Sequence, residues 1–179
     1  MEVIIFILVV IIALVCAYIG LLNALNVAKV KIDEASSDID VALTKRYDVL
    51  TKMIDVVKGY TKYEQETIFK TIELRKNMSI SEKNEASKAM DENVAKIHAL
   101  AENYPELKAS ENFNTLQKAI ADVEEHLQAA RRFYNANVSA YNQKLVTFPS
   151  SLVAGMNGFT KKEFFEAEAA KRSDVKMDF

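Results

Sequence analysis

The side chains best suited to chemistry in this 179-residue chain are two tyrosines and two asparagines repeated at a seven-residue spacing. Tyr134 is followed by Asn135, and Tyr141 is followed by Asn142. Because seven residues return to the same face of a helix, the four side chains form one polar and aromatic stripe. Such a stripe could bind a small ligand through hydrogen bonds, or it could seal the interior of a helical bundle. The tyrosines fall in the apolar register of their predicted helix, which favours the interior.

An interior position requires partners for the polar atoms, because an unsatisfied buried polar group costs about 1–3 kcal/mol. Antiparallel packing of this helix against the first one makes three charged side chains possible partners: Asp40, Arg46 and Asp48. A polar residue at a core position can also fix the register of helices against each other. A ligand-binding cavity remains the alternative.

No motif in the chain indicates catalysis or a bound cofactor. His98 and His126 lie on different predicted helices, without acidic or cysteine residues at metal-ligand spacing. The chain lacks a glycine-rich phosphate loop and a nucleophile elbow. Its net charge of −2 and pI near 5.8 provide no basic patch for nucleic acid. We therefore expect no enzyme activity, no cofactor, no metal and no nucleic-acid partner.

Residues 3–22 contain no charged side chain. As a helix they span about 30 Å, the thickness of the hydrocarbon core of a bilayer. Only Met1 and Glu2 precede them, whereas a cleaved secretory signal would begin with basic residues. We predict an uncleaved transmembrane anchor that contacts the lipid bilayer, in which the lone Cys16 is an apolar residue of the span. Lys29 and Lys31 follow it, which favours an outside N-terminus and a cytoplasmic C-terminal domain.

The scarcity of helix breakers, with four glycines and two prolines, predicts an all-α fold. Apolar residues at steps of three and four predict helices at about 29–77, 80–103 and 111–148. Short connections favour antiparallel neighbours, so we expect the transmembrane helix to continue into an elongated up-down bundle of three long helices. The predicted regions are an anchor and exit (1–28), the bundle (29–148) and a C-terminal tail with a short helix (149–179) that acts as a partial fourth element.

The predicted apolar face of each helix and its capping residues can be stated by position. The first helix presents Ile32, Ala35, Ile39, Leu43, Tyr47, Leu50, Ile54 and Val57. The second helix presents Ala86, Met90, Val94, Ile97, Ala101 and Tyr104. The third presents Phe113, Leu116, Ile120, Val123, Leu127, Ala130, Tyr134, Val138, Tyr141, Leu145 and Phe148. A short turn of helix is expected at residues 152–156. Ser79 and Glu82 have the spacing of a capping box, as do Thr160 and Glu163 before the tail helix. Pro105 is expected to end the second helix, and Ser110 to cap the third.

Two stretches of the sequence resemble the bacterial LemA family. The first stretch carries Asp40, Arg46, Tyr47, Asp48, Lys58, Gly59 and Tyr60. The second carries Asn112, Phe113, Leu116, Ala130, Arg131, Arg132, Tyr134, Asn135, Tyr141, Asn142 and Phe148-Pro149, and Gly158-Phe159 with Phe164-Phe165-Glu166-Ala167 resembles the tail of the family. The resemblance implies a bacterial membrane protein with an N-terminal anchor and a helical bundle, and no enzyme activity. It also implies a polar core of nine residues: Asp40, Arg46, Tyr47, Asp48, Arg131, Tyr134, Asn135, Tyr141 and Asn142.

These expectations lead to two functional hypotheses. The first is a non-enzymatic, membrane-anchored scaffold or interaction protein in the bacterial cell membrane. We expect this protein to form a homo-oligomer, because parallel anchors place copies side by side. The second is a small-ligand sensor that uses the Tyr/Asn layer between the first and third helices. The sequence identifies no partner protein for either hypothesis.

Overall fold

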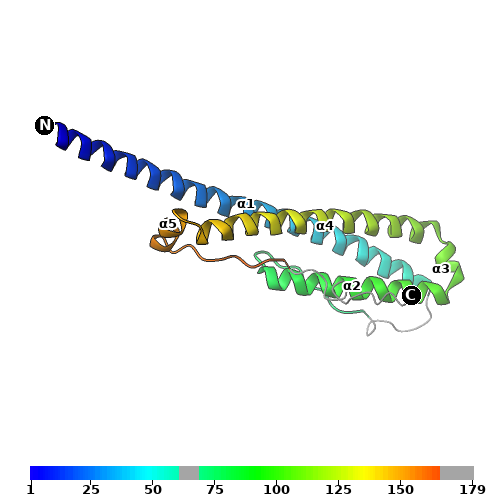
Figure 1. The fold of residues 1–179 in the computed structure, drawn as a ribbon. Coiled ribbons are helices and arrows are strands. Elements are labelled where there is room, and N and C mark those ends of the chain that lie inside the picture. The colour runs from blue at the N-terminus through cyan, green and yellow to red at the C-terminus, as the bar shows by residue number, and fades with distance from the viewer. Residues whose placement is uncertain (61–68, 166–179) are drawn as a thin grey trace, which may run out of the picture. The chain divides into compact units, whose positions relative to one another are not determined.

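The computed structural model describes residues 1–60 and 69–165, and within these ranges it contains helices and no strand. The helices are α1 (Glu2–Tyr60), α2 (Ile80–Asn103), α3 (Pro105–Ala109), α4 (Glu111–Val146) and α5 (Ser150–Met156), as Figure 1 shows. The prediction of an all-α fold is confirmed.

The contacts within the chain divide it into two compact units. The first unit comprises Met1–Ser36 and Arg132–Phe164, and the second comprises Ser37–Arg131 and Phe165–Phe179. Both α1 and α4 therefore contribute residues to each unit. The regions predicted from the sequence (1–28, 29–148 and 149–179) follow the order of elements instead, and this division stays a prediction.

In the second unit, α1 buries a strict heptad seam. Six buried positions follow one another at steps of four and three: Ile39, Leu43, Arg46, Leu50, Met53 and Val57. Ala42, next to Leu43, is buried as well. The predicted stripe placed Tyr47 and Ile54 in this seam, but both are half-buried. The seam keeps the coiled-coil period of 3.5 residues, which selects Arg46 and Met53 instead.

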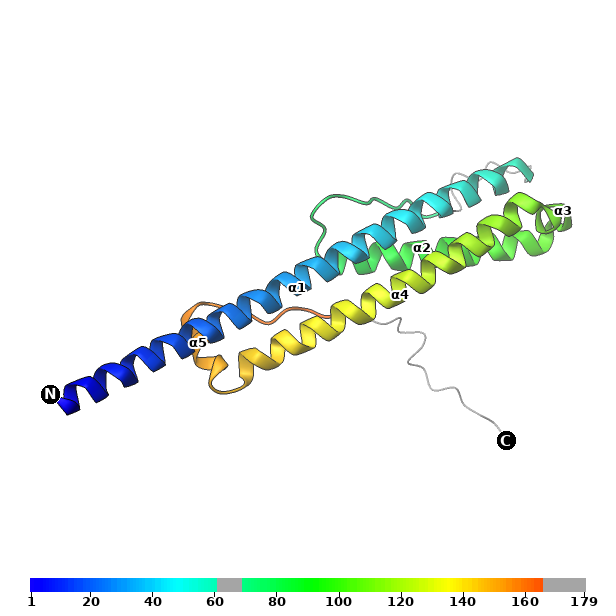
Figure 2. The same cartoon turned by 90° about the horizontal axis from the view of Figure 1, so that it is seen from above.

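The direction of α2 differs from the predicted up-down arrangement. Asp40 of α1 pairs with Lys83, and Arg46, further along α1, pairs with Asp91, further along α2. Contacts that advance together along both helices mean that α1 and α2 run parallel, as Figure 2 also shows. The prediction that α2 runs antiparallel to α1 was therefore wrong.

The reason lies in the connection between these helices. The first helix was predicted to reach residue 77, but α1 ends at Tyr60, and residues 69–79 are not helical. Residues 61–68 lie outside the described part of the chain. Lys70 contacts Glu92, and Arg75 contacts Glu82, so residues 69–79 run back along α2 in the opposite direction. This returning segment allows α2 to begin again in the direction of α1.

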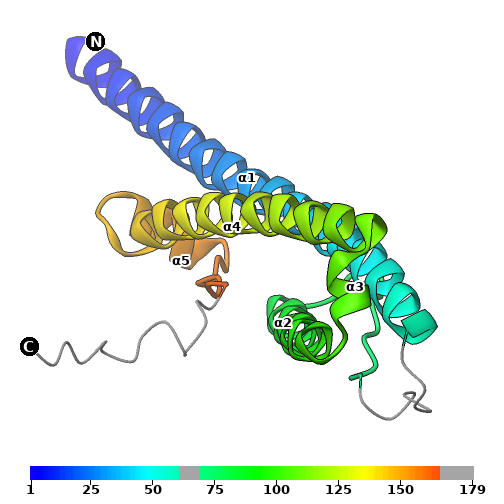
Figure 3. The same ribbon diagram turned by 90° about the vertical axis from the view of Figure 1, so that its right-hand side faces the viewer.

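The local signals around α2 and α3 are confirmed. The Ser79 N–H donates to Glu82 Oε2 at 2.6 Å, and the Glu82 N–H donates to Ser79 Oγ at 3.2 Å, which completes the capping box. The hydrogen bond from the Ser79 backbone is the main reason that the pKa of Glu82 lies below its usual value. Pro105 follows the end of α2 and begins α3, an unpredicted short helix between α2 and α4 (Figure 3).

In the first unit, α5 packs against α1. Leu25, Val153 and Ala154 form a buried apolar cluster. Figure 1 shows α5 beside α1. The predicted short helical turn at residues 152–156 is confirmed as part of α5. The predicted helix start at Thr160 is wrong as far as Phe165, because residues 160–165 have no helical structure. The rest of that predicted tail helix lies outside the described residues.

Candidate functional site

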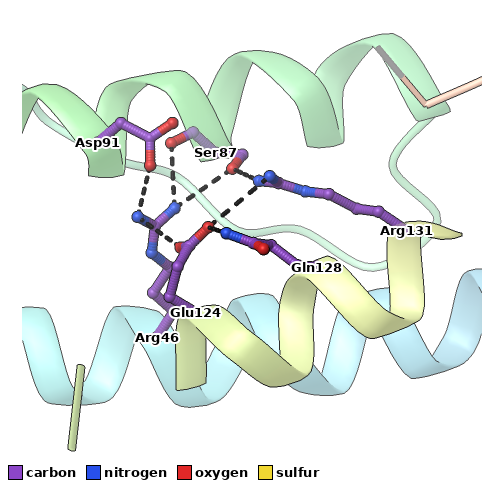
Figure 4. Close-up of polar contacts among 6 residues, drawn as sticks. All are labelled: Arg46, Ser87, Asp91, Glu124, Gln128 and Arg131. Carbon is purple, nitrogen blue, oxygen red and sulfur yellow. Dashed lines mark hydrogen bonds and ion pairs between the residues drawn. The ribbon is translucent and has the colours of Figure 1, made fainter. Parts of the chain in front are cut away.

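The second unit contains a buried cluster of charged side chains from three helices, shown in Figure 4. Arg46 of α1 is 4% exposed and lies at its centre. Its Nη2 forms an ion pair with Asp91 of α2 and lies 2.9 Å from Glu124 Oε2 of α4. Its Nη1 donates to the Ser87 hydroxyl at 3.3 Å. One guanidinium group therefore ties α1 to both neighbouring helices.

Arg131 of α4 completes this cluster from the other side of Ser87. It donates a hydrogen bond to Ser87 Oγ, and its Nη1 lies 3.9 Å from Glu124 Oε1. Its guanidinium carbon lies 4.9 Å from the centre of the Phe165 ring, a cation–π distance. We call Arg46, Ser87, Asp91, Glu124 and Arg131 the arginine cluster. Contacts of α4 with α2 run from Arg131–Ser87 to Gln117–His98, so these two helices are antiparallel.

The chemistry of the arginine cluster favours a structural role. Its two arginines and two acids balance in charge, so no charged ligand is needed to neutralise it. Ser87 Oγ accepts hydrogen bonds from both arginines. Arginine stays protonated in proteins and serves only as a donor, so neither arginine can act as a base toward this hydroxyl. Polar groups in a buried position can instead fix which residues of neighbouring helices face each other.

The nine residues of the predicted polar core are divided between the two units: the Tyr/Asn stripe belongs to the first unit and the other five residues to the second. Asp40 forms an ion pair of 2.7 Å with Lys83, whose side chain is buried. Tyr47 is half-buried and Asp48 is exposed. Both line a hollow of about 520 Å³ against residues 74–78. Of the predicted residues from the first helix, only Arg46 lies at a buried polar centre, together with Arg131.

The Tyr/Asn stripe lies in the first unit and meets different partners from those predicted. The Tyr134 hydroxyl donates to the Glu163 carbonyl at 3.0 Å. Asn142 binds the backbone of Lys162 twice: its Nδ2 donates to the carbonyl, and its Oδ1 accepts from the N–H, each at 2.9 Å. Tyr141 is 1% exposed, and Asn135 is half-buried. Asp40, Arg46 and Asp48 were possible partners of this stripe, but the hydrogen bonds of Tyr134 and Asn142 go to the backbone of residues 162–163 instead.

Burial shifts the pKa of both tyrosines in the same direction. Loss of contact with water raises the pKa of the Tyr134 hydroxyl, and the charges of Glu163 and Asp33 raise it further. Burial also raises the pKa of Tyr141. Both hydroxyls are therefore held in the neutral form, which suits an interior position. Whether the stripe binds a ligand stays an untested prediction, and these bonds to the chain itself give it no support.

Several polar residues of α2 were missed by the sequence interpretation. Lys83, Asn84, Ser87 and Asn93 are buried. The predicted apolar face of α2 runs from Met90 back to Ala86, whereas a step of three from Met90 reaches Ser87 and a further step of four reaches Lys83. That continuation was the available signal for these two residues. The described residues contain no group of three or more histidine, cysteine, aspartate or glutamate residues arranged to hold a metal ion.

Comparisons with known proteins bear on the family of the chain. The model of the LemA family matches residues 35–179. Protein LemA of Metamycoplasma hominis is 31% identical over 163 residues, which cover 88% of this chain and 74% of that protein. Magnetosome protein MamQ 1 of Paramagnetospirillum magneticum is 25% identical over 77 residues, which cover 43% of this chain and 28% of that protein. The family model matches most of the chain, and a protein of the same family is 31% identical to it over 88% of its length. The chain therefore belongs to the LemA family.

Proposed function

We propose that this protein is a non-enzymatic, membrane-anchored scaffold or interaction protein. The observation that carries the proposal is the continuity of α1 from Glu2 to Tyr60. Its N-terminal part is apolar and long enough to cross a membrane, and the side chains of that part are not buried within the protein. Its C-terminal part supplies the buried seam of the second unit. The apolar stretch and the residues of the buried seam therefore belong to one helix.

Exposure of the N-terminal side chains supports the anchor. Large apolar residues such as Phe6, Leu8 and Leu14 are more than half exposed. At about 25 cal/mol per Å² of apolar surface, transferring such a row of side chains from water to lipid is strongly favourable. The proposed location is the bacterial cell membrane, as a single-pass protein. Lys29 and Lys31 support a cytoplasmic C-terminal domain.

Membrane fractionation in alkaline carbonate tests the anchor. We expect the natural chain to stay in the membrane pellet. The double variant Val10→Lys/Ile11→Lys is expected to be released, because each lysine at the centre of a span costs about 2.5–3.5 kcal/mol. The matched control is Val27→Lys/Val30→Lys, two exposed positions of α1 beyond the apolar stretch. Release of the natural chain would contradict the anchor.

Self-association is the second part of the proposal. Val27 and Val30 are 56% and 53% exposed, one turn apart on α1, just after the apolar stretch. Anchors inserted in the same direction bring this face of several copies to the same height, which supports parallel oligomers. Light scattering of the full chain in mild detergent measures the assembly. We expect oligomers for the natural chain and a lower mass for Val27→Lys/Val30→Lys. A natural chain that is strictly monomeric would remove the support for self-association.

A further inference from the structure

We propose that the protein has a second membrane contact, formed by the corner between α4 and α5. The corner comprises residues 145–160. In this proposal its exposed apolar side chains lie in the interfacial layer of the bilayer, beside the transmembrane helix. The inference rests on the proposed anchor, because the anchor sets the depth of this corner.

The composition of the corner sets it apart from the rest of α4. Residues 145–160 contain no charged side chain, although 27% of the whole chain is charged. Lys144 precedes the corner, and Lys161 and Lys162 follow it. Uncharged residues flanked by lysines suit a segment that enters the acyl boundary while the ammonium groups stay among anionic headgroups.

One face of the corner is attached to the end of the apolar stretch of α1. Val153 and Ala154 pack with Leu25, and Tyr18, Leu21, Leu22, Leu145 and Phe159 pack around this cluster. Asn157 Nδ2 donates to the Tyr18 hydroxyl at 3.0 Å. Lys144 Nζ donates to the Ala24 carbonyl at 3.4 Å. These contacts all involve residues 18–25, which straddle the C-terminal end of the predicted span.

The opposite face of the corner is apolar and uncovered. Val146, Phe148, Leu152 and Met156 are 63%, 76%, 61% and 78% exposed. A gathering of large apolar side chains at the surface marks a contact with a partner or with lipid. Because α5 packs on residues 18–25, its other face lies at the depth where that helix leaves the hydrocarbon. Lipid is therefore the occupant that the position selects, with side chains buried about 5–10 Å into the headgroup and acyl boundary.

The natural chain contains no tryptophan, so single tryptophans can report depth without background. Phe148→Trp, Leu152→Trp and Met156→Trp are placed one at a time in the full chain. Each variant is reconstituted into vesicles of phosphatidylcholine and phosphatidylglycerol whose acyl chains carry bromine, a contact quencher of tryptophan fluorescence. Val10→Trp reports on the anchor itself. Phe133→Trp is the matched control, because Phe133 is an exposed aromatic residue of α4 outside the corner.

We expect the three corner tryptophans to lose emission in brominated vesicles relative to unbrominated ones, and Phe133→Trp to keep its emission. Quenching of Val10→Trp without quenching of any corner tryptophan would overturn the second contact and leave the anchor intact. If Val10→Trp is not quenched in brominated vesicles, the anchor itself is contradicted. Acrylamide in the aqueous phase gives the complementary measurement, since it is expected to quench Phe133→Trp more than the corner variants.

Discussion

The two units hold a non-helical segment against a helix with the same device but in different surroundings. In the second unit, Asn93 binds the Lys70 N–H at 2.8 Å and the Lys70 carbonyl at 2.9 Å. In the first unit, Asn142 binds the N–H and carbonyl of Lys162, each at 2.9 Å. Asn93 is fully buried, whereas Asn142 is half-buried. A carboxamide has one donor side and one acceptor side, so it can pair with a backbone as a strand would.

The surroundings of the two asparagines differ in the same sense as the units themselves. The second unit combines Asn93 with the arginine cluster, so buried polar bonds help to fix which residues of its neighbouring segments face each other. The first unit combines Asn142 with the apolar cluster around Leu25. Buried polar bonds cost more to break than exposed ones, because the remaining partner loses water without replacement. Because the bond geometry of the two asparagines is nearly the same, we expect burial to decide which of them contributes more to the free energy of unfolding.

The largest effect is expected from Arg46→Ala. Removing a partner of a buried ion pair costs about 3–5 kcal/mol, and we expect the lower end because Asp91 and Glu124 are each about a quarter exposed. Denaturant unfolding of the detergent-solubilised chain, followed by circular dichroism, measures the loss. The control is Arg132→Ala, which removes an exposed arginine from α4. Equal stability of the two variants would mean that the arginine cluster contributes nothing to the second unit.

A second expectation is that Asn93→Ala costs about 2–3 kcal/mol. The variant removes two hydrogen bonds and leaves the Lys70 backbone groups without their side-chain partner. Amide hydrogen exchange locates the effect, which we expect at the Lys70 N–H and in the neighbouring turns of α2. Unchanged protection at Lys70 would show that the returning segment is held by other contacts.

A smaller loss, about 1 kcal/mol, is expected for Asn142→Ala, since water can replace part of what the half-buried amide provides. The sharper measurement is local. Trypsin is expected to cut after Lys161 and Lys162 faster in this variant than in the natural chain, because the backbone at Lys162 is released. Asn137→Ala is the control, since Asn137 bonds only the Phe133 carbonyl within its own helix. A larger loss for Asn142→Ala than for Asn93→Ala would break the comparison.

The smallest effect concerns the titration of the first unit at high pH. The pKa values of Tyr134 and Tyr141 are raised above 10.0, so the folded state holds these protons more tightly than the unfolded state. Their contribution to stability is complete below about pH 10 and is lost as the pH rises through the folded pKa values. Alkaline titration followed by tyrosinate absorbance measures this directly. Tyr134→Phe and Tyr141→Phe should each remove a late step, whereas Tyr60→Phe should leave both late steps in place.

Features that depend on nearby residues could be predicted from the sequence. The charge-free stretch at residues 3–22, the capping box at Ser79 and the helix end before Pro105 involve neighbours within a few positions. The bounds of α2 follow from such local rules. The periodic apolar seams also indicated an all-α fold. Two of the predicted seam positions were off by one residue, because Arg46 and Met53 are buried where Tyr47 and Ile54 were expected.

The partners of the buried polar groups could not be found in this way. Arg46 pairs with Asp91, 45 residues away, and with Glu124 on a third helix. Other aspartate and glutamate residues lie in similar helical sequences, so the residues around Asp91 and Glu124 do not identify them as the partners of Arg46. The direction of α2 depended in turn on residues 69–79, which are not helical and in which the Lys70 backbone is bound by Asn93. The sequence alone determined the all-α class, the bounds of α2, the apolar stretch and the family resemblance, because short-range propensity and periodicity specify them. Only the tertiary structure decided the parallel course of α2 and the partners of Arg46, Asn93 and Asn142, because these depend on which distant groups packing brings within hydrogen-bonding distance.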